Sequence, residues 1–299
     1  MHILLLVLAL APGVNLIPGR FVPGVFPDGN TVVFNAPKGL IVFDTGRHPE
    51  HTQAIVDFAR ESHAPVEAII NSHWHLDHIG GNPMLRAAYP KTAVYASATL
   101  EDAQKGFLAN YRKQLEEAIA QTPDPEKQKP YRAEIAIIDS GKALGPDHVV
   151  SSSGTQKIAG RKLDLELESN AVTAGDVWIF DPTTRVLASG DLVTLPVPFL
   201  DTACPSQWKA ALDHVAKYDF DVLVPGHGAP MHRKEFEQYR TAYGNLLACA
   251  ASDKTKEQCI DGWMADAGSL IADEKPKFVR AVLAYYIETP LRSKVNACK

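Results

Sequence analysis

The chain has 299 residues, of which 45% are hydrophobic and 22% charged, enough apolar material for one large domain or two smaller ones. These fractions are close to globular averages, so wholesale disorder and fibrous repeats are excluded. The formal net charge is -5, and such a mildly acidic chain lacks the basic character that nucleic-acid binding requires. We therefore expect no nucleic-acid partner.

The chain starts with a short apolar run, ILLLVLAL, at residues 3–10. Because a membrane span needs about 20 apolar residues, we expect no stable membrane insertion. The run resembles the hydrophobic region of a secretory signal, and Ala9-Leu10-Ala11 fits a small-residue cleavage site. The pattern predicts a signal peptide over residues 1–11 and a periplasmic or secreted protein. A buried first strand or the start of a helix is the alternative.

The first half of the chain alternates strand and helix patterns. The predicted elements are strands 31–36 and 40–44, helix 49–62, strand 66–70, helix 83–88 and strand 92–95. From about residue 98 to 135, apolar residues recur at helical spacing among many charged ones, with a proline-containing break at 121–126. We expect an α/β layered domain that carries a helical insertion over about 98–135.

The second half is again rich in strands and ends in helices. The predicted elements are strands 157–158, 161–168, 176–180 and 186–189, a helix marked by Trp208, Leu212 and Val215, strand 221–224, and a helical tail over about 231–299. Both halves run from strands to a helix. We therefore expect a single domain over residues 12–299.

The four cysteines include no C-x-x-C pair. Cys249 and Cys259 lie ten residues apart between two helical stretches and could form a disulfide, which would leave Cys204 to pair with Cys298. Three connectivities remain open from the sequence, and four buried thiols are the alternative.

A histidine-rich segment, NSHWHLDHIGGN, follows the predicted strand 66–70 and covers residues 71–82. Its possible ligands are His73, His75, Asp77 and His78. The first three alternate with apolar residues, so the polar set should face one way and the apolar set the core. Imidazole and carboxylate are ligands that Zn²⁺ prefers. Three histidines and an aspartate within six residues predict a metal site.

This run matches an H-x-H-x-D-H motif and resembles the metallo-β-lactamase superfamily. Three further segments agree with the family in order: Asp44-Thr45-Gly46 with its D-T-G turn, Ser189-Gly190-Asp191 with the strand end that carries a metal-bridging aspartate, and Pro225-Gly226-His227-Gly228 with its terminal histidine motif. The resemblance covers about two-thirds of the chain. It implies an α/β fold, a four-layer αββα sandwich of two mixed β-sheets flanked by helices.

The resemblance also implies a role for each matching residue. His73 and His75 would hold one Zn²⁺ ion, Asp77, His78 and His227 would hold a second, and Asp191 would bridge the two. A metal-bound water or hydroxide would attack a carbonyl, with Asp77 as the catalytic residue that orients it. The implied function is a zinc-dependent hydrolase with one or two ions, acting on a small-molecule β-lactam, lactone or thioester.

One position departs from the family pattern. Family members carry a metal-binding histidine in a segment like H-T-x-G-D, where this chain has Val172, and a valine cannot coordinate. Asn170 and Thr173 offer only neutral oxygens, and His148 lies well upstream. Three alternatives follow: one metal at the second site, two metals with the first held weakly, or a weakly catalytic or non-catalytic metal-binding protein. We expect a working hydrolase, because every other ligand position matches.

The remaining histidines on predicted helices or their edges lie among charged residues: His48, His51, His63, His214 and His232. We expect solvated surface positions for them and assign them no role.

Overall fold

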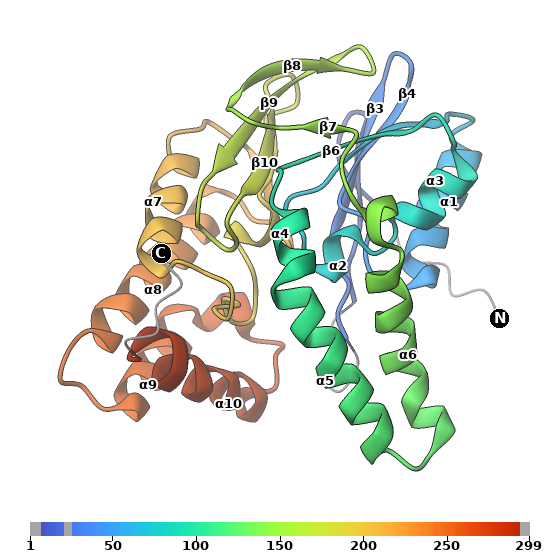
Figure 1. The fold of residues 1–299 in the computed structure, drawn as a ribbon. Helices are drawn as coiled ribbons and strands as arrows, with labels where there is room; N and C mark the ends of the chain where they lie inside the picture. Colours follow the sequence, from blue (N-terminus) through green and yellow to red (C-terminus); the bar gives the residue numbers. More distant parts are fainter. Residues whose placement is uncertain (1–6, 21–25, 294–299) are drawn as a thin grey trace. The chain divides into compact units, whose positions relative to one another are not determined.

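The computed structural model describes residues 7–20 and 26–293. The chain divides into two compact units, Met1–Lys162 and Leu163–Lys299, which are called the first and the second unit below. The strands form one seven-stranded and one five-stranded sheet, both mixed, and helices flank them (Figure 1). The predicted α/β class with two mixed sheets is therefore confirmed.

The seven-stranded sheet has the strand order β1-β2-β3-β4-β5-β6-β7. Its strands are β1 (Leu8–Ala11), β2 (Val14–Ile17), β3 (Thr31–Ala36), β4 (Gly39–Phe43), β5 (Val66–Ile70), β6 (Ala93–Ala96) and β7 (His148–Val149). Neighbours are antiparallel from β1 to β4 and parallel from β4 to β7. The predicted hairpin and the two strands after it are confirmed. The carboxyl ends of the parallel strands share one edge of this sheet, and the histidine-rich segment begins there.

The start of the chain is part of this sheet. Strand β1 pairs antiparallel with β2, so the alternative of a first strand describes residues 8–11, although the strand is only partly buried. Residues 1–6 of the predicted signal peptide lie outside the described residues. Export stays a prediction.

The helices of the first unit are α1 (Pro49–Glu61), α2 (Leu76–Ile79), α3 (Asn82–Ala88), α4 (Leu100–Lys105), α5 (Phe107–Gln121) and α6 (Pro125–Asp139), followed by a 3-10 turn at Gly141–Leu144. Helices α1 and α3 bury Ile55, Val56 and Leu85 against the sheet residues Val42 and Ile69. These contacts account for the helical period that predicted α1, since its apolar face meets the sheet.

The predicted insertion consists of α4, α5 and α6, and it runs past residue 135 to Asp139. Helices α5 and α6 lie side by side as a hairpin (Figure 1), joined by an ion pair of 2.8 Å between Arg112 Nε and Asp139 Oδ1. The break falls where the prolines predicted it. Pro125 begins α6 at a position where no backbone N–H is needed, and the Asp124 side chain accepts a hydrogen bond from Glu126 N.

The five-stranded sheet has the order β12-β11-β10-β9-β8. Its strands are β8 (Gly154–Ile158), β9 (Arg161–Glu168), β10 (Asp176–Asp181), β11 (Val186–Ala188) and β12 (Val222–Val224), and the helices of the second unit are α7 (Pro205–Val215), α8 (Arg233–Ala250), α9 (Lys256–Asp266) and α10 (Pro276–Tyr286). Strand β10 pairs antiparallel with β9 and β11, whereas β11 and β12 are parallel. Trp178, Trp208, Tyr239, Trp263 and Leu283 belong to one buried core in this unit.

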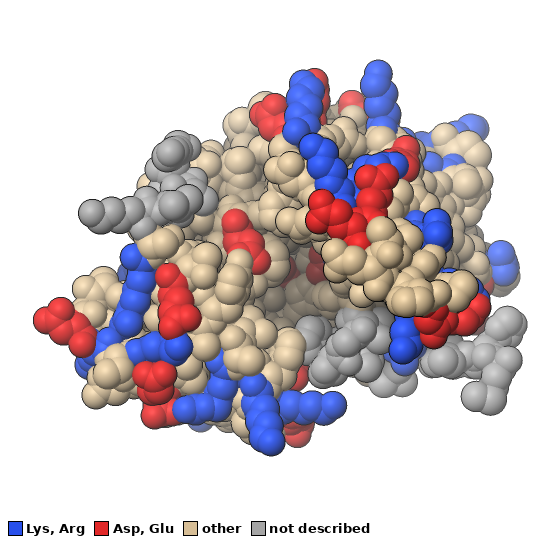
Figure 2. All heavy atoms as spheres, turned by 60° about the horizontal axis from the view of Figure 1, so that its bottom comes forward, with Lys and Arg blue, Asp and Glu red and all other residues tan. Residues whose placement is uncertain are grey.

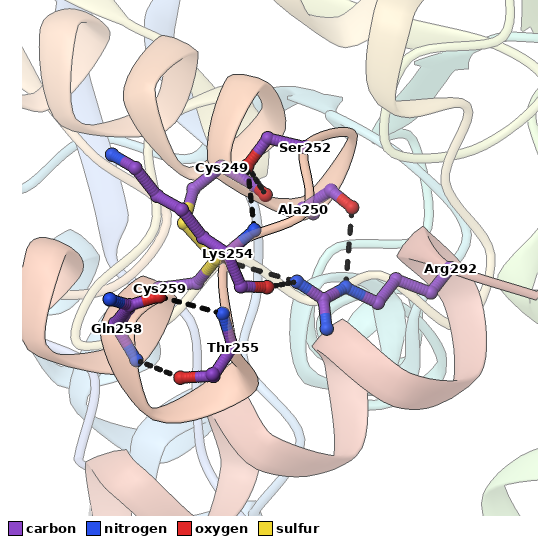
Figure 3. Close-up of a disulfide and its surroundings, with 8 residues drawn as sticks. All are labelled: Cys249, Ala250, Ser252, Lys254, Thr255, Gln258, Cys259 and Arg292. Atoms are coloured by element: carbon purple, nitrogen blue, oxygen red, sulfur yellow. Dashed lines mark hydrogen bonds between the residues drawn. A yellow bond between two sulfur atoms is a disulfide. The ribbon is translucent and has the colours of Figure 1, made fainter.

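A disulfide joins Cys249 near the end of α8 to Cys259 in α9 (Figure 3). Arg292 spans the same turn and donates hydrogen bonds to Ala250 O and Lys254 O. The predicted Cys249–Cys259 pairing is confirmed. The pairing of Cys204 with Cys298 involves a position outside the described residues.

Charged side chains of both signs are mixed on the face seen in Figure 2, where Lys and Arg alternate with Asp and Glu and form no continuous basic stripe among the described residues. Within the described part of the chain, no helix has the length and apolar character needed to cross a membrane.

Candidate metal centre

The histidine-rich segment leaves the end of β5 and turns into the short helix α2. Its apolar residues Trp74, Leu76 and Ile79 are buried in a cluster with residues of α4, α5 and α6. The expected alternation is thus confirmed on its apolar side. Helix α2 starts directly after His75, whose carbonyl accepts hydrogen bonds from His78 N and Ile79 N. The helical insertion therefore packs on the back of the segment that carries the predicted ligands.

The four predicted ligands of this segment come together in the first unit. The ring centroid of His73 lies 4.3 Å from that of His75 and 4.3 Å from that of His78. The Oδ2 atom of Asp77 lies 3.7 Å from His78 Nε2. All four residues are buried, with exposed fractions between 0% and 9%. The first unit thus presents three imidazoles and one carboxylate within a small buried volume.

Asp44 orients two of these imidazoles. It follows β4 with a φ of 58°, a strained backbone conformation for a non-glycine residue. Its carboxylate accepts hydrogen bonds from Ser72 N and Ser72 Oγ, both at 2.7 Å, and its Oδ2 lies 2.8 Å from His78 Nδ1. Since the Ser72 hydroxyl donates to Asp44, its oxygen accepts from His73 Nδ1 at 2.9 Å. One buried carboxylate therefore sets the tautomer of both His73 and His78.

These residues fit a divalent transition metal such as Zn²⁺. With the proton on Nδ1, each neutral ring carries its lone pair on Nε2, the arrangement of a metal-binding histidine backed by a carboxylate or hydroxyl. His73, Asp77 and His78, unlike His75, belong to groups of described histidine and aspartate side chains that could hold a metal ion. Burial raises the pKa of Asp44, and His78 opposes that effect. The sequence places Asp44 in the D-T-G turn, but only the fold shows its contacts with Ser72 and His78.

The other two predicted ligands lie in the second unit, after two adjacent parallel strands. Asp191 is in the 3-10 turn Gly190–Leu192 that follows β11, and His227 follows β12. The atoms His227 Nε2 and Asp191 Oδ1 are 3.6 Å apart. The turns are tied by hydrogen bonds from Gly226 N to Gly190 O at 2.8 Å and from Leu195 N to His227 O at 3.1 Å. The sheet thus brings both ligands to one edge.

Gly226 has no side chain for a local reason. A Cβ atom at this position would lie 1.9 Å from Asp191 Oδ1 and 2.8 Å from the carbonyl carbon of Gly190. Any larger residue would therefore displace the Asp191 carboxylate, so the glycine of the P-G-H-G segment preserves the position of a predicted ligand.

The segment around Val172 supplies no obvious replacement for the missing histidine. Val172 is 0% exposed and belongs to the core of the second unit. Thr173 turns its hydroxyl toward Asp176 Oδ1, at 3.0 Å, and Asn170 is exposed. Burial raises the pKa of Asp176 to about 7. His148 lies on β7, an end strand of its sheet, where its ring stacks on Tyr95.

Two charged residues of the first unit escaped the sequence analysis. The guanidinium of Arg47 has its Nη2 3.4 Å from Asp77 Oδ1 and its Nη1 3.4 Å from Glu134 Oε2. Burial raises the pKa of Glu134, and the nearby Arg47 opposes that effect. Arg47 directly follows the D-T-G turn, so its place in the sequence could have indicated that it lies near the predicted ligands. Glu134 lies in the helical insertion, and only the fold shows its contact with Arg47.

The surface prediction for His51 is wrong. His51 is 1% exposed, and its Nε2 lies 2.7 Å from Thr31 Oγ1. It occupies the inner face of α1, where the turn of the helix places it against the sheet. His48 is also held, since its Nδ1 lies 2.9 Å from Oδ2 of the buried Asp28. This contact raises the pKa of His48. Asp28 additionally accepts from Arg47 N and His48 N and so fixes the start of α1.

The motifs and the fold define a class of protein. Residues 24–227 match the family model of the metallo-beta-lactamase superfamily. The chain belongs to this superfamily, and the resemblance seen in the sequence is confirmed.

The chain is similar to proteins with different named activities. The chain is 26% identical to a linear primary-alkylsulfatase of Pseudomonas sp. (strain ATCC 19151) over 226 residues, which is 68% of this chain and 42% of the relative. It is 41% identical to a hydroxyacylglutathione hydrolase of Gloeobacter violaceus over 73 residues, which is 21% of this chain and 29% of that enzyme. The chain thus spans less than half the length of these relatives.

Solved structures of the superfamily share the fold. A metallo-beta-lactamase from Pontibacter korlensis superposes with a TM-score of 0.60 at 19% identity, covering 80% of this chain and 99% of that one. At this identity the likeness concerns the fold alone. It agrees with the two mixed sheets and flanking helices of this chain.

Proposed function

We propose that this chain is a metal-dependent hydrolase whose two ligand sets form one Zn²⁺ centre. In this proposal His73, His75, Asp77 and His78 act together with Asp191 and His227, as the order of the family motifs implies. The observation that carries it is the hydrogen bonding of the Asp44 carboxylate. Together with the Ser72 hydroxyl it engages Nδ1 of His73 and His78 and so leaves Nε2 of both rings available to bind a metal. Membership of a superfamily of hydrolases supports the reaction class.

In this proposal Asp77 and Asp44 have different roles in the reaction. A bound metal supplies Lewis acidity and activates a water molecule for attack on the substrate. Asp77 would orient the attacking water through its carboxylate. Asp44 would keep His73 and His78 in the Nδ1-protonated tautomer throughout the reaction, because it is buried and fully engaged.

We propose that the metal site formed by Asp77, His78 and His227 fills first. The site with His73 and His75 lacks a third histidine, because Val172 stands at that position within the packed core. A site with fewer strong donors binds Zn²⁺ more weakly. The enzyme would therefore work with one tightly held ion, or with a second ion of lower affinity.

The proposed substrate is a small molecule with an electrophilic carbonyl, either a thioester, a lactone or a β-lactam. The match to a hydroxyacylglutathione hydrolase supports this class. A second candidate is an alkyl sulfate ester. It is favoured by the alkylsulfatase, whose similarity extends over 68% of this chain. Export stays part of the proposal, and the Cys249–Cys259 disulfide is consistent with an oxidising compartment.

The test combines metal analysis with a substrate panel. Protein purified without added chelator is analysed for bound metals, stripped, and reloaded with Zn²⁺. It is then assayed with a β-lactam, a lactone, a thioester and an alkyl sulfate. We expect roughly one tightly bound ion per chain and hydrolysis of at least one substrate that disappears on stripping. Protein that binds Zn²⁺ but hydrolyses none of them would favour the non-catalytic alternative, and protein that binds no Zn²⁺ would refute the proposal.

A further inference from the structure

Arg47 lies between two carboxylates of the first unit and is only slightly exposed. Its side chain is 11% exposed. One amino group, Nη2, faces Asp77 Oδ1 and the other, Nη1, faces Glu134 Oε2, each at 3.4 Å. A planar guanidinium can address two carboxylates with separate groups, whereas a lysine ammonium acts as a point charge. Arg47 therefore links the metal-binding segment to a residue of α6.

The helical insertion builds the surroundings of this guanidinium. Glu134 is 2% exposed and accepts a hydrogen bond from Tyr111 OH of α5 at 3.3 Å. The guanidinium carbon of Arg47 lies 5.2 Å from the ring centroid of Phe26, within cation–π range. Phe26 in turn makes an edge contact with Tyr131 of α6. Both hairpin helices thus fix the direction of the Arg47 side chain.

The two oxygens of Asp77 have different neighbours. Oδ1 faces Arg47, whereas Oδ2 lies 3.7 Å from His78 Nε2, the atom left for a metal once Asp44 has engaged Nδ1. A carboxylate on a short side chain can turn about its Cβ–Cγ bond, and an intermediate turn would move both oxygens away from these two positions. The Arg47 contact fixes the turn of the Asp77 carboxylate plane.

We infer that Arg47 is a positioning residue that holds Asp77 Oδ1 and so presents Oδ2 to the metal, and that Glu134 and the α5–α6 hairpin hold Arg47 in place. The inference rests on the proposed metal centre. It assigns the helical insertion a part in building that centre, beyond covering apolar surface. A purely structural Arg47, which only fastens the hairpin, would change stability without changing the geometry at Asp77.

The test measures metal binding, not turnover. Stripped wild-type protein and Arg47→Met are titrated with Zn²⁺ in competition with a chromophoric chelator, and with Co²⁺ while its visible spectrum is recorded. Loss of a residue that orients a ligand typically weakens metal binding about 10–100-fold, and we expect a loss in this range together with a changed Co²⁺ spectrum. Arg47→Lys keeps the positive charge but cannot contact both carboxylates with separate groups. Its Zn²⁺ affinity should therefore lie between those of wild type and Arg47→Met.

The matched control is Arg86→Met. Arg86 also pairs with a carboxylate in the first unit, Asp147 at 2.9 Å, and it touches none of the predicted ligands. Its substitution should leave Zn²⁺ affinity and the Co²⁺ spectrum unchanged. In an Asp77→Asn background, Arg47→Met should cause little further loss, because the group through which it acts is altered.

Each other outcome is decisive. If the Zn²⁺ affinity of Arg47→Met were unchanged, Arg47 would not position a ligand, and the inference would be overturned. A raised Zn²⁺ affinity would also overturn it, because Arg47 would then act only as a charge that repels the metal. An equal loss in the Asp77→Asn background would overturn it as well. If Arg47→Met does not fold, a wild-type spectrum and affinity in Arg47→Lys would count against it. Wild-type protein that binds no metal would instead refute the proposed function.

Discussion

His51 should make the stability of the protein fall in mildly acidic solution. Burial lowers its pKa from 6.5 to about 4, against a smaller opposing effect of Asp28. The folded state therefore keeps His51 neutral, whereas the unfolded chain binds a proton below pH 6.5. Stability from this residue is present above that pH and is lost as the pH falls toward 4. The full loss is about 3 kcal/mol, of which about 2 kcal/mol is already lost at pH 5.

The measurement compares urea unfolding at pH 7.5 and pH 5.0, in the presence of a chelator, for wild type and His51→Gln. Glutamine cannot titrate and can still bond to the Thr31 hydroxyl, which lies 2.7 Å from His51 Nε2. We expect the loss of unfolding free energy between the two pH values to be about 2 kcal/mol smaller in the variant. The control is His63→Gln, at an exposed position, which should behave as wild type. Equal losses in wild type and His51→Gln would refute the reasoning.

Three further changes test the metal centre and the second unit. Val172→His should raise the number of Zn²⁺ ions bound per chain and the hydrolytic rate, measured by metal analysis and by assay; no change in either would mean that the first site is not used. Gly226→Ala should weaken Zn²⁺ binding at least about 10-fold in a chelator competition, because its Cβ would lie 1.9 Å from Asp191 Oδ1; wild-type affinity would contradict the need for glycine. Replacing Cys249 and Cys259 by alanine should lower the unfolding free energy by about 3 kcal/mol, as expected for closure of a loop of this size. An unchanged urea midpoint would show that the disulfide adds no stability.

Local patterns were sufficient for many of the helices and strands and for naming the predicted ligands of residues 73–78. The strand at 66–70 and the helix at 49–62 appear nearly as predicted, because each has an apolar period that only one secondary structure satisfies. His73, His75, Asp77 and His78 are close in the sequence, so a single turn gathers them in any compact fold. The absence of a histidine ligand at Val172 stays a prediction, which rests on the place of Val172 within a recognisable segment.

Partners that are distant in the sequence were beyond the reach of pattern reading. Glu134 looks like one of many charged residues of an amphipathic hairpin, yet it is 2% exposed and faces Arg47. His51 has charged neighbours along the chain, but its place on α1 turns it toward the sheet. The charge of a neighbour in sequence says little about burial, because adjacent helical residues point in different directions.

The buried charges give a second reason to expect a cation in the first unit. Asp44 and Asp77 both contact His78, and Glu134 contacts Arg47, which also contacts Asp77. Of these three buried carboxylates, Asp77 and Glu134 contact the Arg47 guanidinium and Asp44 contacts His78, and burial raises the pKa of both Asp44 and Glu134. Buried charge is costly unless it is neutralised or paired. A divalent ion on the Nε2 side of the histidines would supply the missing positive charge. The donor geometry and the charge balance therefore favour the same kind of ligand.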